Sequence, residues 1–218
     1  MQICTRNSFA LVPAISRWSK KKNTVQTSRR RYVLLERDGV INRRGPCGSV
    51  TSWDHFEFLP KALDALRLLA ENDCVTLVIS NQAVGRGFLS STDLDTITRR
   101  FLLEVALSGG NIAQVYYCRH AAEDSCNCHK PRPGLILRAQ IEHRFVPENT
   151  FLVDDSSAGL LAAEATGCPS ILIRREAFLE NRNARHEPPI VACNLYEAVE
   201  LILAAHQVDR QEHMLAPL

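Results

Sequence analysis

The chain has 218 residues, of which 45% are hydrophobic and 23% are charged. A chain of this size and apolar content can bury a substantial core, which excludes a disordered or fibrous protein. Its 26 basic and 24 acidic residues give a net charge of +2, so the composition offers no general argument for nucleic-acid binding. Because no apolar run approaches the ~18 residues of a membrane span, we expect a cytoplasmic protein that does not bind membranes.

The small net charge conceals a basic N-terminal segment. Residues 1–35 carry eight basic side chains and no acidic one, which leaves 18 basic against 24 acidic residues, a net charge of −6, in the remainder. The segment is rich in Arg, Ser and Thr, as organellar transit peptides are, but it lacks a clean amphipathic period. We therefore predict that residues 1–31 form a disordered basic extension.

From Tyr32 onward, short β-branched runs alternate with amphipathic helical patterns, which is the rhythm of βα units around a parallel sheet. The predicted strands are Tyr32–Leu35, Val75–Ser80, Ile112–Cys118, Thr150–Val153 and Ser170–Ile173. The predicted helices are Lys61–Glu71, Ser91–Leu107, Pro133–His143, Ser157–Ala165 and Leu195–Ala205. The polar, proline-ended stretch Glu180–Pro189 is predicted to be a surface loop. Since such sheets bind ligands outside the carboxyl ends of their strands, we expect the chemistry there.

The first predicted strand ends in Glu36-Arg37-Asp38-Gly39. Residues two apart in an extended chain project to the same side, so the carboxylates of Glu36 and Asp38 can face one point. There they could hold a hard cation such as Mg²⁺ or divide the roles of nucleophile and acid between them. The alternative is an acidic strand end with a glycine turn and no chemistry.

Polar side chains also follow two other predicted strands. Those at and beyond the end of the second strand are Ser80, Asn81, Gln82 and Arg86. Hydroxyl, amide and guanidinium groups beside flexible glycine backbone suit a phosphate or a sugar, although alone they also fit an ordinary loop. The fourth strand is followed by Asp154, Asp155 and Ser156. We expect one aspartate to point toward Asp38 and complete a Mg²⁺ site, and the other, with Ser156, to cap the next helix.

Four soft metal ligands fall within eleven residues: Cys118, His120, Cys126 and Cys128. Three thiolates and one imidazole match the closed tetrahedral set of a structural Zn²⁺ site, although the two pairs are spaced more tightly than in zinc fingers. The alternative is four unrelated residues. His129 and Lys130 follow directly, before a stiff Pro-Arg-Pro segment, and Lys130 could neutralise a phosphate or a nucleophilic carboxylate.

Taken together and in this order, these segments resemble the haloacid dehalogenase (HAD) phosphatases, and within them the subgroup of D-glycero-D-manno-heptose 1,7-bisphosphate phosphatases and histidinol-phosphatases. The resemblance runs from about Tyr32 to Arg175. Its most specific pieces are Arg37–Asn42, Phe56–Pro60, Ser80–Gln82 and the cysteine-rich loop that leads into Lys130-Pro131. It implies a HAD-type Rossmann-like three-layer α/β sandwich around a parallel sheet, capless, with a zinc-stabilised loop. Residues 32–210 would form this single phosphatase domain.

The resemblance further implies a phosphomonoesterase that hydrolyses a sugar bisphosphate, with a heptose of surface-polysaccharide synthesis as the nearest match. We expect the protein to be a monomer. The carboxylate of Glu36 would attack phosphorus, while Asp38 would protonate the departing sugar oxygen and later activate water. Ser80 and Lys130 would bind the transferred phosphoryl group. The metal would be a Mg²⁺ ion held by Glu36, the backbone carbonyl of Asp38, and Asp155. The groups that would contact the substrate elsewhere are Asn81, Gln82, Arg86, His129 and the loop 42–51.

Several functional positions depart from the family pattern. Glu36 stands where the family has Asp, Asp154-Asp155 replaces a Gly-Asp pair, Gly159 replaces a further acid, and His129 replaces Arg. The extra methylene of Glu36 displaces the attacking oxygen by about 1 Å or more unless the backbone retreats, and such a misplacement can cost ~10²-fold in rate. Two hypotheses therefore stand: a phosphatase that works through Glu36, and a non-catalytic relative that binds a phosphorylated sugar or a protein.

Overall fold

The structure is a computed structural model that describes residues 30–45, 48–85, 89–173 and 190–215. Residues 1–29, which make up most of the predicted N-terminal extension, lie outside the described residues. So do the predicted surface loop Glu180–Pro189 and the candidate substrate-binding residue Arg86.

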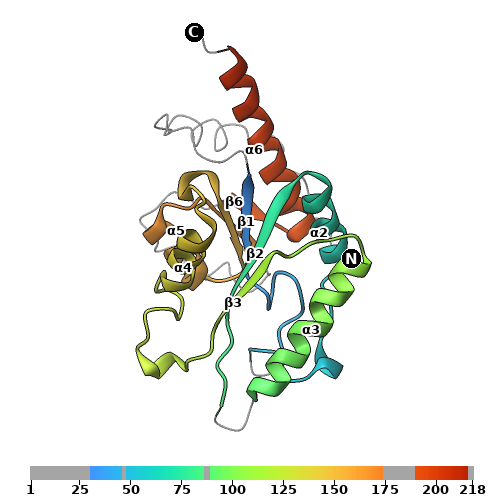
Figure 1. Ribbon diagram of the computed structural model, residues 1–218, viewed down its shortest axis with the longest axis vertical. Helices are drawn as coiled ribbons and strands as arrows, with labels where there is room; N and C mark the ends of the chain where they lie inside the picture. The colour runs from blue at the N-terminus through green and yellow to red at the C-terminus, as the bar shows by residue number, and fades with distance from the viewer. Residues whose placement is uncertain (1–29, 46–47, 86–88, 174–189, 216–218) are drawn as a thin grey trace.

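Six parallel strands form one sheet in the order β3-β2-β1-β4-β5-β6 (Figure 1). The strands are β1 (Arg31–Leu35), β2 (Cys74–Asn81), β3 (Gln114–Cys118), β4 (Phe151–Asp154), β5 (Ser170–Ile173) and β6 (Ile190–Ala192). All five predicted strands are present, and β6 is an addition. In the central pair, Leu35 of β1 is in register with Val153 of β4. The next residues, Glu36 and Asp154, therefore reach the carboxyl edge of the sheet side by side.

Helices cover both faces of the sheet, as the buried, apolar strands β1 and β4 require. The helices on one face are α2 (Ala62–Glu71), α3 (Ser91–Leu107) and α6 (Leu195–Leu215). Those on the other are α4 (Gly134–His143) and α5 (Ser157–Thr166). Alternation along β1 sends Val33 and Leu35 to the first face, and Tyr32 and Leu34 to the second. The predicted three-layer α/β sandwich is confirmed.

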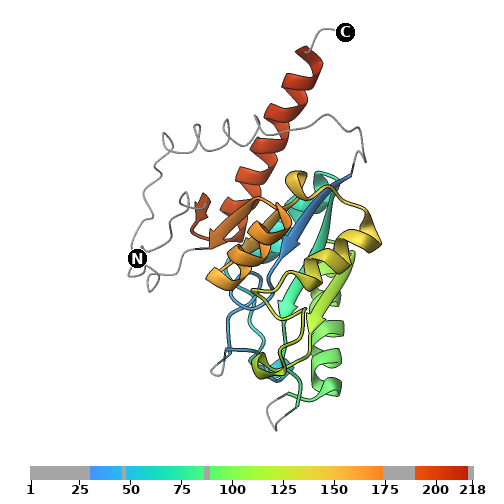
Figure 2. The ribbon, with the colours of Figure 1, turned by 90° about the vertical axis from the view of Figure 1, so that its left-hand side faces the viewer.

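The predicted helices agree with the observed ones to about one residue, except at the C-terminal end of α6. That helix continues past the predicted end at Ala205 to Leu215, and it projects beyond the rest of the fold (Figure 2). Among the described residues, no helix is both long and apolar enough to cross a membrane.

Three short helical turns stand in loops among the described residues, two of them after β1 and β3 at the carboxyl edge and one before β4 at the amino edge. They are the 3₁₀ turns η1 (Trp53–His55), η2 (Ala122–Asp124) and η3 (Pro147–Asn149). Of the residues described between β1 and α2, only η1 is helical, so this part of the chain inserts no cap domain. The carboxyl edge is instead bordered by loops, which is where the candidate site lies.

Candidate active site

A cavity of about 260 Å³ opens at the carboxyl edge of the sheet. Its charged and polar lining includes Glu36, Asp38, Arg44, Asn81, His129 and Lys130. Five of these six were predicted as site residues from the sequence, and Arg44 lies in the loop 42–51 that was expected to face the sugar. Separate segments of the chain, from residue 36 to residue 158, thus meet at one opening.

The carboxylate of Glu36 lies in the cavity wall and is 5% exposed. Its Oε1 accepts a hydrogen bond from the Ser80 hydroxyl at the end of β2, and its Oε2 accepts one from the Lys130 ammonium. The same ammonium donates to Oδ2 of Asp154. One buried cation therefore joins two buried carboxylates that come from neighbouring strands.

Burial and neighbouring charges shift the pKa values of Glu36 and Lys130. Burial raises the pKa of Glu36 to about 7, with the Lys130 charge opposing the rise and the Asp154 charge adding to it. Burial alone would lower the pKa of Lys130, but its two carboxylate partners outweigh that effect and raise the pKa above its ordinary value. Lys130 is therefore charged at every physiological pH, while Glu36 gains its charge near neutrality.

In Mg²⁺-free buffer, we expect the contribution of Glu36 to stability to fall as the pH rises. Its pKa is about 7 in the folded chain against 4.5 for an ordinary glutamate, so the contribution is complete below pH 4.5 and is lost as the pH rises through about 7. Relative to Glu36→Gln, the free energy of unfolding of the wild type should fall by about 3 kcal/mol across this window. Urea unfolding of both proteins at several pH values measures the difference, and a constant difference would contradict the assignment.

Asp38 is 2% exposed and is held by three side chains. It accepts hydrogen bonds from Asn42 Nδ2 at 2.7 Å, Gln82 Nε2 at 2.8 Å and Arg37 Nε at 3.0 Å. Arg37 is itself fully buried and also donates to Gln82 Oε1 at 2.8 Å. Hydrogen bonds from three side chains therefore hold the carboxylate of Asp38 in one orientation.

This network corrects one prediction and adds one residue. Gln82 was expected to face the sugar, but it is fully buried. Its side-chain amide accepts a hydrogen bond from Arg37 and donates one to Asp38. Arg37 was not singled out in the sequence. The available signal was its place between two acids at a strand end, since a buried guanidinium must be paired with a carboxylate.

The two aspartates after β4 have different surroundings. Asp155 packs on Gly39, where an added Cβ would lie 1.9 Å from Asp155 Oδ2, and the φ of Gly39 is +99°. Glycine is therefore required at the turn after β1, both for its backbone angle and for the room that Asp155 takes. Asp154 points instead to Lys130 and accepts a hydrogen bond from Ser156, whose own hydroxyl caps α5 by accepting from the Gly159 N–H at 3.2 Å.

A guanidinium faces the carboxylates that were predicted to hold a cation. Arg44 binds Asp155 at two points, with Nε 2.8 Å from Oδ2 and Nη2 2.5 Å from Oδ1. The hydrogen bond to Asp155 raises the pKa of Arg44, and the charges of Glu36 and Asp38 raise it further. The sequence could not single out this contact because its two residues are 111 positions apart.

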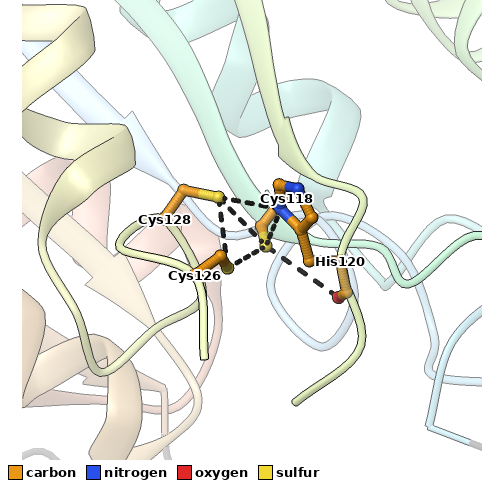
Figure 3. Close-up of side chains that lie close together, drawn as sticks. All are labelled: Cys118, His120, Cys126 and Cys128. Carbon is orange, nitrogen blue, oxygen red and sulfur yellow. Dashed lines mark hydrogen bonds between the residues drawn. The ribbon is translucent and has the colours of Figure 1, made fainter. Parts of the chain in front are cut away.

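The four soft ligands converge in the loop after β3 (Figure 3). The ligand atoms of Cys118, His120, Cys126 and Cys128 all lie within 4.8 Å of one another. The sulfur atoms are 3.4–3.6 Å apart, and His120 Nδ1 is 3.2 Å from the Cys128 sulfur. Such a set could hold one metal ion with four protein ligands and no open coordination position.

The cysteine-rich loop is also joined to the cavity. His129 lines the cavity, and its Nδ1 lies 3.6 Å from the Cys118 sulfur. Lys130 N donates to Asn81 Oδ1 at 3.1 Å, and Asn81 Nδ2 donates to the Lys130 carbonyl at 3.3 Å. This pair of bonds fixes the backbone of Lys130 against the end of β2. The fold of the loop therefore determines where the Lys130 ammonium lies.

Comparisons with known proteins identify relatives of this chain. A family model described as HAD-hydrolase-like matches residues 127–198, which include Lys130, Asp154 and Asp155. The D-glycero-beta-D-manno-heptose-1,7-bisphosphate 7-phosphatase of Helicobacter pylori is 35% identical over 133 residues, which cover 60% of this chain and 75% of the relative. The D-glycero-alpha-D-manno-heptose-1,7-bisphosphate 7-phosphatase of Mycobacterium tuberculosis is 36% identical over 148 residues, covering 65% and 78%.

Solved structures show the same likeness. The crystal structure of D,D-heptose 1,7-bisphosphate phosphatase from B. bronchiseptica, complexed with magnesium and phosphate, superposes with a TM-score of 0.74 at 27% identity, covering 80% of this chain and 98% of that one. The fold, the cavity at its carboxyl edge and these relatives lead to one assignment. The chain belongs to the heptose 1,7-bisphosphate phosphatase family of HAD-like hydrolases.

Proposed function

We propose that the chain is a Mg²⁺-dependent phosphomonoesterase that removes the 7-phosphate from D-glycero-D-manno-heptose 1,7-bisphosphate, with Glu36 as its nucleophile. The observation that carries the proposal is the Glu36 carboxylate, which lies in the cavity wall with the Ser80 hydroxyl and the Lys130 ammonium bound to its two oxygens. The names of the relatives support the choice of sugar.

Each residue of the site then has a chemical role. Glu36 attacks phosphorus and forms an acyl phosphate, while the bond from phosphorus to the sugar oxygen breaks. Asp38 gives its proton to the departing sugar oxygen and then takes one from the water that hydrolyses the acyl phosphate. Lys130 and Ser80 bind the phosphoryl oxygens, where a buried cation stabilises the charge that develops. The three partners of Asp38 keep its carboxyl group aimed at the leaving oxygen.

The residues at the carboxyl edge fit a Mg²⁺ ion. Glu36 and Asp155 offer hard carboxylate oxygens, Asp38 adds a backbone carbonyl, and Gly39 leaves room for the Asp155 carboxylate. A bound Mg²⁺ would neutralise charge on the phosphate and its attacker. At the second site, the four ligands within 4.8 Å of one another fit Zn²⁺, which would stabilise the loop and take no part in the reaction.

Removing the Arg44 charge should strengthen Mg²⁺ binding, because Arg44 occupies both oxygens of Asp155. We expect Arg44→Met to raise the Mg²⁺ affinity by about tenfold or more, as measured by isothermal titration. Arg43→Met is the matched control, since Arg43 makes a similar two-point pair with Glu57. Arg43 and Glu57 are both exposed, and neither lines the cavity. Equal Mg²⁺ affinities for the two variants would contradict the competition.

The proposed activity is tested by phosphate release from both anomers of the heptose 1,7-bisphosphate, with and without Mg²⁺. We expect one phosphate to be released per molecule, from position 7, and release to stop when Mg²⁺ is withheld. Heptose 1-phosphate, which lacks the 7-phosphate, is the control substrate and should be inert. An absence of phosphate release from every substrate in the presence of Mg²⁺ would overturn the proposal.

The second candidate is a non-catalytic relative that binds the phosphorylated sugar. One observation favours it: both oxygens of Glu36, which carries an extra methylene, are already bound by Ser80 and Lys130. In that case the wild type releases no phosphate, but the bisphosphate raises its melting temperature, because a ligand of the native state stabilises it. A wild type without phosphatase activity and without this shift would exclude both candidates.

A further inference from the structure

A buried carboxylate next to the cavity has no part in the mechanism so far. Asp154 is fully buried and does not line the cavity. Its Oδ2 accepts from the Lys130 ammonium, and its Oδ1 accepts from the Ser156 N–H at 2.9 Å and the Ser156 hydroxyl at 2.6 Å. Because Ser156 caps α5, the carboxylate is fixed to the first turn of that helix. It can act on a bound substrate only through Lys130.

The space for this carboxylate comes from Gly159, the third residue of α5. An added Cβ at Gly159 would lie 2.0 Å from Asp154 Cγ and 2.1 Å from Oδ2, too close for the two side chains to coexist. Its φ is outside the left-handed region, so the backbone itself would accept any residue. Glycine is needed at 159 for space alone. A side chain built there would enter the volume that the Asp154 carboxylate fills.

We propose that Asp154 is a positioning residue that holds the Lys130 ammonium beside Glu36. The space next to Lys130 holds one carboxylate, which can come from a side chain at position 154 or from one at position 159, but not from both. The proposal rests on the proposed function in one respect, namely that Lys130 binds the phosphoryl group.

The contacts of Lys130 explain why it needs this partner. Its ammonium has the carboxylates of Glu36 and Asp154 as partners, and the Ile79 carbonyl lies farther off at 3.4 Å. Glu36 is the group that must change during the reaction, so a second, unreactive carboxylate keeps the ammonium in place. Asp154 suits that role because Ser156 fixes its other oxygen and no solvent reaches it.

The test exchanges the two residues. The proteins compared are the wild type and the variants Asp154→Gly, Gly159→Asp, Asp154→Gly/Gly159→Asp and Asp154→Gly/Gly159→Ala. Thermal unfolding gives their stability, and isothermal titration with inorganic phosphate in the presence of Mg²⁺ reports on Lys130 without requiring turnover. The two double variants fill the same space with and without a carboxylate, so they separate packing from positioning.

We expect Asp154→Gly to weaken phosphate binding by about tenfold and to lower the melting temperature by about 5–10 °C. Gly159→Asp alone should be the least stable variant, because two carboxylates compete for one volume. The exchange Asp154→Gly/Gly159→Asp should recover phosphate affinity to within about threefold of the wild type. Asp154→Gly/Gly159→Ala should recover stability only, because it restores packing without a partner for Lys130.

Two results would overturn the proposal: equal phosphate affinities for the two double variants, or an unchanged affinity in Asp154→Gly. If the exchanged protein does not fold, Asp154→Asn keeps the shape and removes the charge, and a phosphate affinity equal to that of the wild type would then refute the positioning role. Phosphate binding that follows the expected order in a protein that hydrolyses no substrate would support the positioning role and reject the phosphatase.

Discussion

Glu36→Gln is expected to abolish phosphate release, lowering kcat by about 10³-fold or more, because an amide cannot attack phosphorus. The variant should still fold. Lys130 keeps the carboxylate of Asp154 as its partner, so the substitution leaves no unpaired buried charge. Phosphate release from the heptose bisphosphate measures the effect, and thermal unfolding verifies that the fold is retained. Turnover by Glu36→Gln at the rate of the wild type would show that Glu36 is not the nucleophile.

Glu36→Asp completes this experiment. The shorter side chain withdraws the carboxylate by about 1 Å, and aspartate is the residue that the family resemblance implies at this position. We expect kcat to rise by as much as ~10²-fold. Withdrawal also lengthens the contacts with Ser80 and Lys130, which frees oxygen lone pairs for Mg²⁺. A silent wild type beside an active Glu36→Asp would favour the non-catalytic candidate, since only the scaffold would then have been retained.

Cys126→Ser is expected to reduce the bound zinc from about one ion per chain to nearly none, because it removes one of four ligands from a closed set. Structural zinc contributes on the order of 10 kcal/mol in small domains, so the melting temperature should fall markedly. Phosphate affinity should fall as well, because Lys130 and His129 follow the loop directly and His129 contacts the Cys118 sulfur. Elemental analysis, thermal unfolding and phosphate titration measure the three effects.

Cys168→Ser is the matched control for the zinc experiment. Cys168 is a free, buried cysteine that lies outside the group of four ligands. The same change of sulfur for oxygen should cost some stability through burial of a hydroxyl, but it should leave the zinc content unchanged. A full complement of zinc in Cys126→Ser, or equal zinc loss in both variants, would contradict the assignment of the ligands.

Patterns that repeat within a few residues predicted most of the fold. The short β-branched runs and the apolar positions three and four apart identified five strands and five helices, because burial against a neighbouring layer imposes those periods. β6 was missed because three residues, Ile190–Ala192, are too few to show a period. The end of α6 was missed because the polar residues after Ala205 break the apolar pattern, although the helix continues to Leu215.

Some features of the candidate site could likewise be predicted from the sequence, and others could not. The sequence alone determined the α/β class, the acidic strand ends and the four candidate metal ligands within eleven residues, because these depend on residues that are close along the chain. Only the tertiary structure decided that Gln82 supports Asp38, that Arg44 pairs with Asp155, and that Asp154 fills the space above Gly159. Such contacts depend on how loops and strand ends pack at the edge of the sheet, and no local pattern records which distant side chain fills a given volume.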